Sequence, residues 1–81
     1  MDDLIQALRD ALGPSADIQI DVLGNSNRIG GLIIWDGFDE LSQRERQKLV
    51  WDIIRTQPAQ LQLQMAPVIT LTNSEVLVNA A

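Results

Sequence analysis

The stretch Trp35–Ile54, WDGFDELSQRERQKLVWDII, decides the fold of this chain. It contains the end of an apolar run, a turn and the longest amphipathic segment of the sequence. At about 100° per residue, the side chains of this segment separate into an aliphatic face and an opposite face with cations and an indole. The aliphatic face carries Leu49, Val50, Ile53 and Ile54, and the opposite face carries Arg44, Lys48, Trp51 and Arg55. We therefore expect a helix that packs on a small sheet and presents a basic, aromatic ridge to water.

A capping signal, Ser42-Gln-Arg-Glu45, marks the start of this helix. In a capping box the serine oxygen accepts a hydrogen bond from the third helical N–H, and the glutamate reaches back to the serine N–H. The helix is expected to run to about Thr56, because Pro58 restricts the backbone of the residue before it.

Three residues of the same stretch are assigned structural roles. Asp36-Gly37 ends a strand, and Phe38, the only phenylalanine of the chain, is expected to pack under the turn. Arg46 lies near the middle of the apolar face, where a buried guanidinium must be paired. Its candidate partners are Asp36, Asp39 and Glu75. We expect a structural ion pair that fixes local geometry rather than a ligand site.

Upstream of this stretch, the sequence predicts one helix followed by two strands. The helix ends at Gly13-Pro14, and its expected buried stripe is Leu4, Ile5, Leu8, Ala11 and Leu12. Alternation predicts a strand over Ala16–Leu23. Its expected buried residues are Ala16, Ile18, Ile20 and Val22, and its water-facing residues are Asp17, Gln19 and Asp21. A glycine-rich loop, Gly24–Gly31, leads to a more enclosed strand at Leu32–Trp35.

Downstream, Ala59–Gln64 fits either a strand or a helical turn. Val68–Leu71 predicts a third strand, with Pro67 at its start. Thr72-Asn-Ser-Glu75 predicts a second cap and a short final helix. The expected fold class is α+β, with one domain over residues 1–81. It consists of a small three-stranded mixed sheet with helices packed on one face, in the order α-β-β-α-β(-α).

The composition of the 81 residues narrows the possible chemistry, because there is neither cysteine nor histidine. Disulfides, thiolate or imidazole catalysis and soft-metal ligation are therefore excluded. A carboxylate site for a hard cation stays open, although a solvated acidic surface is favoured for Asp17, Asp21, Asp36, Asp39 and Glu40. We expect no enzyme, no cofactor and no metal.

The acidic N-terminus, and the lack of an apolar run of about 20 residues, predict a cytoplasmic protein that does not enter a membrane.

Several motifs of the chain resemble the BolA family of small stress-related proteins. The matching residues are Asp36-Gly-Phe38, Leu41-Ser42, Arg46-Gln-Lys48 and Val50-Trp51, where the family has Asp-Ala-Phe, Ser, Arg-His-Arg and Val-Tyr. Thr70-Leu-Thr72 and Glu75 resemble the family's Thr-x-Thr-Pro-Glu ending. The resemblance implies a fold akin to the class II KH arrangement. It also implies one of two roles, which are transcription-related nucleic-acid binding and partnership with a monothiol glutaredoxin around a shared iron–sulfur cluster.

The departures from the family pattern bear on that cluster. The family's histidine ligand near the C-terminus falls on Gln64, the ligand loop falls on Asn25 to Arg28, and the helical histidine falls on Gln47. Neutral amides replace the imidazole or thiolate that a cluster needs. We therefore expect no cluster ligation by this chain, while docking to a glutaredoxin-like partner stays open.

Two surfaces are candidate binding sites, each with a plainer alternative. The ridge Arg44, Lys48, Trp51 and Arg55 suits a phosphate or a carboxylate with a stacking group, or it is a solvated face whose indole is covered by cationic stems. The loop with Arg28 suits an anion, although a plain connection is favoured. We expect a regulatory module that docks a protein partner, with weak nucleic-acid binding through the ridge as the alternative. The sequence leaves the partner and the oligomeric state open.

Overall fold

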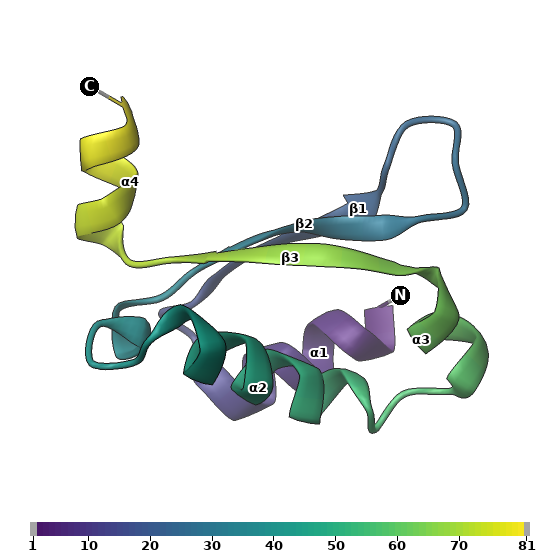
Figure 1. The fold of residues 1–81 in the computed structure, drawn as a ribbon. Coiled ribbons are helices and arrows are strands. Elements are labelled where there is room, and N and C mark those ends of the chain that lie inside the picture. Colours follow the sequence, from purple (N-terminus) through teal and green to yellow (C-terminus); the bar gives the residue numbers. More distant parts are fainter. Residues whose placement is uncertain (1, 81) are drawn as a thin grey trace.

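Three strands form one mixed sheet in the computed structural model, which describes residues 2–80 (Figure 1). Strand β1 (Asp17–Val22) pairs antiparallel with β2 (Ile29–Ile34), which pairs parallel with β3 (Met65–Leu71). Parallel neighbours need a crossover connection. Three helices supply it, namely η1 (Asp36–Phe38), α2 (Gln43–Ile54) and α3 (Ala59–Gln64). The α+β class and the three-stranded mixed sheet are as expected from the sequence.

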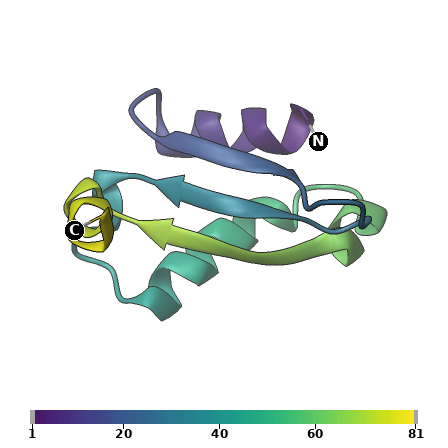
Figure 2. The ribbon, with the colours of Figure 1, turned by 90° about the horizontal axis from the view of Figure 1, so that it is seen from above.

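The helices α1 (Asp2–Leu12) and α2 lie on one side of the sheet and contact each other (Figure 1). The last helix, α4 (Asn73–Ala80), differs from the expected arrangement because it rises from the end of β3 on the opposite side. The loop between β1 and β2 rises on that same side at the other end of the sheet. Viewed from there, no described helix lies over the three strands, and α4 is seen end-on at one side (Figure 2). Among residues 2–80, no helix is both long and apolar enough to cross a membrane.

The hydrophobic core fills the space between the sheet and the pair α1 and α2. The sheet and the residue before β1 contribute Ala16, Ile20, Ile29, Ile33, Met65 and Val68, and the helices contribute Leu4, Leu8, Leu12, Phe38, Val50 and Ile54. Strand residues alternate between the two faces, so only one face of each strand enters this core. The opposite face of the sheet has no described layer upon it.

Two expected core residues are exposed. Ala11 is exposed although it lies within about 60° of the mean direction of the buried leucines, because α1 buries only the narrow stripe Leu4, Leu8 and Leu12. Val22 is 47% exposed, because it is the last residue of β1, where the hairpin leaves the helix layer. The other expected core residues of α1 and β1 are buried or half-buried.

Strand boundaries also differ from those expected. Strand β2 begins at Ile29, so two loop glycines belong to it, and β3 begins at Met65, so Pro67 lies inside the strand. The β2–β3 register shifts between Ile29 and Gly31, which leaves an extra residue on β3 around the proline. A bulge on an edge strand is where a residue without an N–H fits a sheet. The ambiguous segment Ala59–Gln64 is a helix.

Gly31 allows β1 and β2 to pair. Its φ is +144°, and a Cβ there would collide with the backbone oxygen of Gln19 on β1. We predict that Gly31→Ala lowers the free energy of unfolding by more than about 3 kcal/mol in urea titrations. Gly24→Ala is the control, because Gly24 also has a positive φ but has open space around its Cα. It should lose only about 1 kcal/mol, and equal losses for the two variants would contradict this explanation.

Candidate functional site

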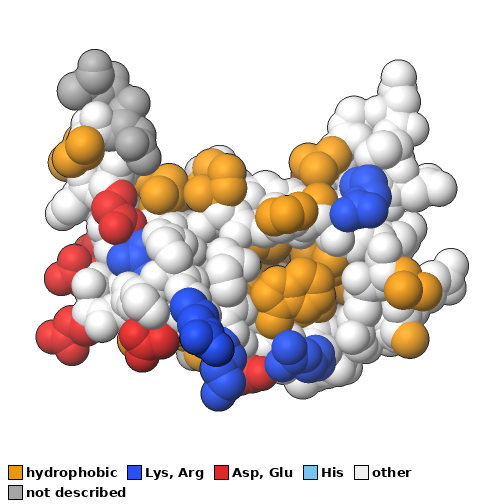
Figure 3. Space-filling model, viewed as in Figure 1, with side chains coloured by type: hydrophobic (Ala, Val, Ile, Leu, Met, Phe, Trp, Pro, Cys, Tyr) orange, Lys and Arg blue, Asp and Glu red, His pale blue; other side chains and the backbone are white. Residues whose placement is uncertain are grey.

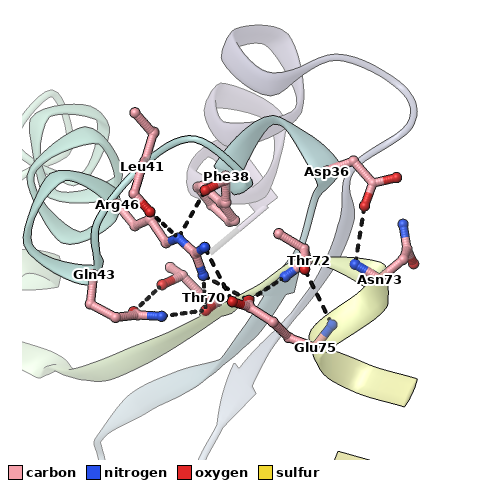
Figure 4. Close-up of polar contacts among 9 residues, drawn as sticks. All are labelled: Asp36, Phe38, Leu41, Gln43, Arg46, Thr70, Thr72, Asn73 and Glu75. Carbon is pink, nitrogen blue, oxygen red and sulfur yellow. Dashed lines mark hydrogen bonds and ion pairs between the residues drawn. The ribbon is translucent and has the colours of Figure 1, made fainter. Parts of the chain in front are cut away.

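A buried guanidinium joins four segments at one end of the sheet (Figure 4). Arg46 is 4% exposed and lies on the core side of α2. Its Nε donates to the backbone oxygens of Phe38 (3.1 Å) and Leu41 (3.0 Å), and its Nη1 donates to that of Thr70 (3.3 Å). Its Nη1 and Nη2 also donate to the two carboxylate oxygens of Glu75, at 2.7 and 3.3 Å. This is the expected structural ion pair, with Glu75 as the partner among the three candidates.

Glu75 also caps the helix that it starts. Its Oε1 accepts from the Thr72 N–H (2.8 Å), and its own N–H donates to the Thr72 hydroxyl (3.2 Å), which makes a reciprocal cap. The Asn73 N–H donates to the Asp36 carboxylate at 3.1 Å, so Asp36 ties η1 to α4 rather than pairing with Arg46. Hydrogen bonds from Arg46, and then from the Thr72 N–H, hold the pKa of the Glu75 carboxyl below its ordinary value. The carboxyl is therefore charged at neutral pH.

The other structural predictions within this region are confirmed. Ser42 and Glu45 form the predicted capping box, with Glu45 N–H to Ser42 Oγ at 3.2 Å and Ser42 N–H to Glu45 Oε1 at 3.1 Å. The Ser42 backbone and then its hydroxyl lower the pKa of the Glu45 carboxyl. Phe38 is fully buried under the turn, and its ring lies 5.7 Å from the guanidinium carbon of Arg46.

Polar side chains of α2 cover the free edge of β3. Gln47 Nε2 donates to the Val68 oxygen (2.8 Å), Gln43 Nε2 donates to the Thr70 oxygen (3.4 Å), and Arg46 shares that second oxygen. The Thr70 hydroxyl donates to Gln43 Oε1 at 2.9 Å. An uncovered edge would offer these carbonyls to another strand. Sequence reasoning missed this role of the glutamines, although their spacing of four residues places them on one side of the helix.

The predicted basic ridge is only partly as expected. Arg44, Lys48 and Arg55 are exposed, but Trp51 is half-buried and packs against the core. The buried line of α2 runs through Arg46, Val50 and Ile54, and Trp51 lies only about 100° from it, on the β3 side. Trp51 is therefore not opposite the core. Figure 3 shows hydrophobic side chains in the hollow between β3 and α2, with lysine and arginine side chains below them.

Acidic neighbours reduce the positive charge of this ridge. Arg55 Nη1 lies 2.8 Å from Asp52 Oδ1 in an exposed ion pair. Lys48 borders a cleft of about 290 Å³ that Glu45 and Asp52 also line. The remaining predicted cation, Arg28, is in the β1–β2 loop and donates from Nη2 to the Met65 oxygen at 3.2 Å. The structure thus does not bring Arg28 together with α2 into one basic site. Within residues 2–80, no three acidic side chains gather in a way that could hold a metal ion.

The uncovered side of the sheet carries apolar side chains that sequence reasoning did not single out. Ile33 is fully buried in the core, so Leu32 and Ile34 on either side of it point to the opposite face. On β3, Ile69 is the register partner of Leu32 and Leu71 that of Ile34. We call these four residues the outer face. The apolar run of β2 predicted a strand more enclosed than β1, which is confirmed, although no described element covers its second side.

The outer face continues at its two ends. At the hairpin end, Leu23 is 42% exposed, and its Cδ1 lies 3.2 Å from where a Cβ on Gly30 would be, so it folds over β2. At the α4 end is a cleft of about 340 Å³, lined by Gln43, Leu71, Ser74, Glu75 and Val78. Figure 3 shows hydrophobic side chains along the saddle between the raised α4 and the raised loop.

Comparisons of the chain with models of protein families, with curated proteins and with solved structures return no match.

We predict that Arg46→Ala lowers the free energy of unfolding by about 3 kcal/mol, because it removes the guanidinium donors from three backbone oxygens and one carboxylate. Urea titration at neutral pH measures the loss. Arg55→Ala is the matched control, since it breaks an ion pair whose side chains are 62% and 51% exposed. It should change stability by no more than about 0.5 kcal/mol. A small loss for Arg46→Ala would show that the network does not hold the fold.

The lowered pKa of Glu75 predicts a pH dependence. A carboxyl whose pKa is lower in the folded chain stabilises it fully above the ordinary value of 4.5, and this contribution is lost as the pH falls through the folded pKa. Glu75→Gln should therefore be less stable than the parent chain at pH 7, with the difference shrinking below pH 4.5. Urea midpoints across this range measure the effect. Glu40→Gln, at an exposed position outside the network, is the control and should match the urea midpoint of the parent at pH 7.

Proposed function

We propose that this chain is a non-enzymatic interaction module of BolA-like architecture that docks a protein partner on its outer face. The observation that carries the proposal is the exposure of Ile69, which is 56% exposed in the middle of β3, beside apolar neighbours on β2. Single exposed aliphatic residues are ordinary on protein surfaces. Here the exposed Ile69 and the half-buried Leu32, Ile34 and Leu71 form two register-paired rows on a sheet face that no described element covers, and such a group is typical of an interaction site.

The architecture supports the family part of the proposal. Apart from the short helices η1 and α3, the observed order is helix, strand, strand, helix, strand, helix, which is the order that the resemblance to BolA proteins implies. Four of the residues that carry the resemblance also make the contacts that hold the helices to the sheet. They are Asp36, Phe38, Arg46 and Glu75.

The sequence supports docking without cluster ligation. Gln64 and Gln47 stand where the family has histidine. The side-chain amide of Gln47 donates a hydrogen bond to the Val68 oxygen. Thiolate and imidazole are absent from the whole chain. We propose that a partner of the monothiol glutaredoxin type would be bound through side-chain packing, with any cluster ligands supplied by the partner.

Binding of nucleic acid through α2 is less well supported than binding of a protein. Such binding needs a local basic patch on a chain whose net charge is −5. Arg55 is already paired with Asp52, and the indole of Trp51 packs inward. Only Arg44 and Lys48 of the ridge are left to contact phosphates without an ion-pair partner among the described residues.

The proposal can be tested by photo-crosslinking in the cell of origin. A photoreactive phenylalanine analogue placed at Ile69 should give discrete protein adducts. The same analogue at Leu63, an 83% exposed aliphatic residue on α3 beneath the sheet, is the matched control and should give none. Equal adducts at both positions, or none at Ile69, would remove the proposed docking surface.

A further inference from the structure

The chemistry of the uncovered sheet side changes from one strand to the next. The two strands β2 and β3 present the aliphatic outer face, whereas β1 presents Asp17, Gln19 and Asp21 on the same side. The register places Asp17 beside Ile34, Gln19 beside Leu32 and Asp21 beside Gly30. The outer face therefore forms an apolar floor that is bordered along one side by Asp17, Gln19 and Asp21. We call this border, which runs parallel to the strands, the acidic margin.

The two carboxylates of this margin are available to a partner. Asp17 accepts a hydrogen bond from Gln19 Nε2 (2.9 Å), and Asp21 accepts one from the Val22 N–H (2.8 Å). Both side chains are exposed, and neither forms an ion pair with a described residue. The cation nearest in sequence to Asp21, Arg28, donates to the backbone oxygen of Met65.

From this pattern we infer the partner's chemistry: an amphipathic helix with an aliphatic stripe and lysine or arginine residues along one side of that stripe. It lies along β2 and β3 between α4 and the hairpin loop, with its basic side over β1. The inference rests on the proposed function, because it names the occupant of the same surface. It goes further by fixing the secondary structure, the charge and the direction in which the partner lies.

The dimensions of the sheet suit a helix. The seven residues of β3 span about 23 Å at about 3.3 Å per residue. A helix of about 15 residues has the same length, and its width of about 10 Å covers two strands. The raised α4 and the raised loop close the two ends of this floor (Figure 1).

A partner strand fits the molecule less well than a helix. The edge oxygens of β3 at Val68 and Thr70 already accept hydrogen bonds from α2 side chains. A strand added beyond β1 would extend the sheet sideways, and Leu32 and Ile69 would stay uncovered. Only an element that lies over the sheet buries the outer face.

A second copy of this chain supplies no such helix within residues 2–80. The aliphatic faces of α1 and α2 are in the core. Helix α4 has exposed Leu77 (73%) and Val78 (75%), but its sequence NSEVLVNA contains an acidic residue and no basic one. An α4 helix from a second copy would bring negative charge to the acidic margin, which favours positive charge. A partner of different sequence is therefore favoured.

The test uses three synthetic peptides of about 18 residues. The probe has leucines at i, i+3, i+4 and i+7 spacing with lysines along one side of the leucine stripe. The charge control replaces these lysines by glutamates, and the shape control shuffles the probe so that its leucines no longer share a face. Fluorescence anisotropy gives the dissociation constants, and amide chemical shifts of the labelled chain locate the site.

We expect the lysine peptide to bind about tenfold more tightly than the glutamate peptide, and the shuffled peptide to bind more weakly than either. The amide shifts caused by the lysine peptide should fall on β2, β3 and α4. Ile69→Glu should weaken binding by about tenfold or more, while Leu63→Glu should leave it within about twofold. The double change Asp17→Lys and Asp21→Lys should abolish the preference for the lysine peptide. These aspartates are exposed, so this variant reports on binding even if Ile69→Glu disturbs folding.

The inference is overturned if the lysine and glutamate peptides bind equally, if the shuffled peptide binds as well as the probe, or if the shifts fall on α2. It is also overturned if the chain dimerises in sedimentation experiments and Ile69→Glu abolishes the dimer, since the face is then occupied by a second copy. If crosslinks at Ile69 form but no peptide preference is found, the docking surface stands and the helical, basic partner does not. Absence of both the crosslinks and the peptide binding removes both proposals.

Discussion

The guanidinium of Arg46 fixes how the helices and the sheet of this chain meet. It is buried, planar and always charged, so its donors must find acceptors in fixed directions. Those acceptors come from the turn after β2, from β3 and from α4 (Figure 4). Because desolvation offsets much of the attraction in a buried ion pair, its main effect is to select one arrangement rather than to add net stability. In an 81-residue chain with a small core, that selection is not left to packing alone.

The same contact determines the shape of the uncovered side of the sheet. Glu75 is both the partner of Arg46 and the cap of α4, so α4 must begin where the guanidinium lies. The Asn73 N–H, held by Asp36, adds a second point of attachment and so limits rotation of the helix. Helix α4 consequently stands at the end of the outer face and leaves the aliphatic rows of β2 and β3 accessible. A structural contact on the core side thus shapes the surface on the other side.

Sequence patterns predicted the elements better than the surfaces. The helices and caps follow from local signals, and the pairing of Arg46 follows from its place on an apolar face. The ridge on α2 was misjudged at Trp51 alone, because a side chain about 100° from the buried line lies at the border of the core, and there the large indole packs inward. Gln43 and Gln47 could not be assigned, since a glutamine on a helix does not indicate which strand edge it will reach. The outer face could not be predicted from the sequence either. An apolar run shows that both sides of a strand are apolar, but it does not show whether a second layer covers each side.

The covered edge of β3 also affects the chain before it is fully folded. Its segment Val68–Leu71 is uncharged and rich in β-branched residues, a composition that favours stacking into cross-β fibrils. In the native state Gln43, Arg46 and Gln47 occupy the carbonyls through which such stacking would begin. Without α2 in place, the same carbonyls would be open to another strand. The docking of this helix therefore protects the chain from association as well as completing its core.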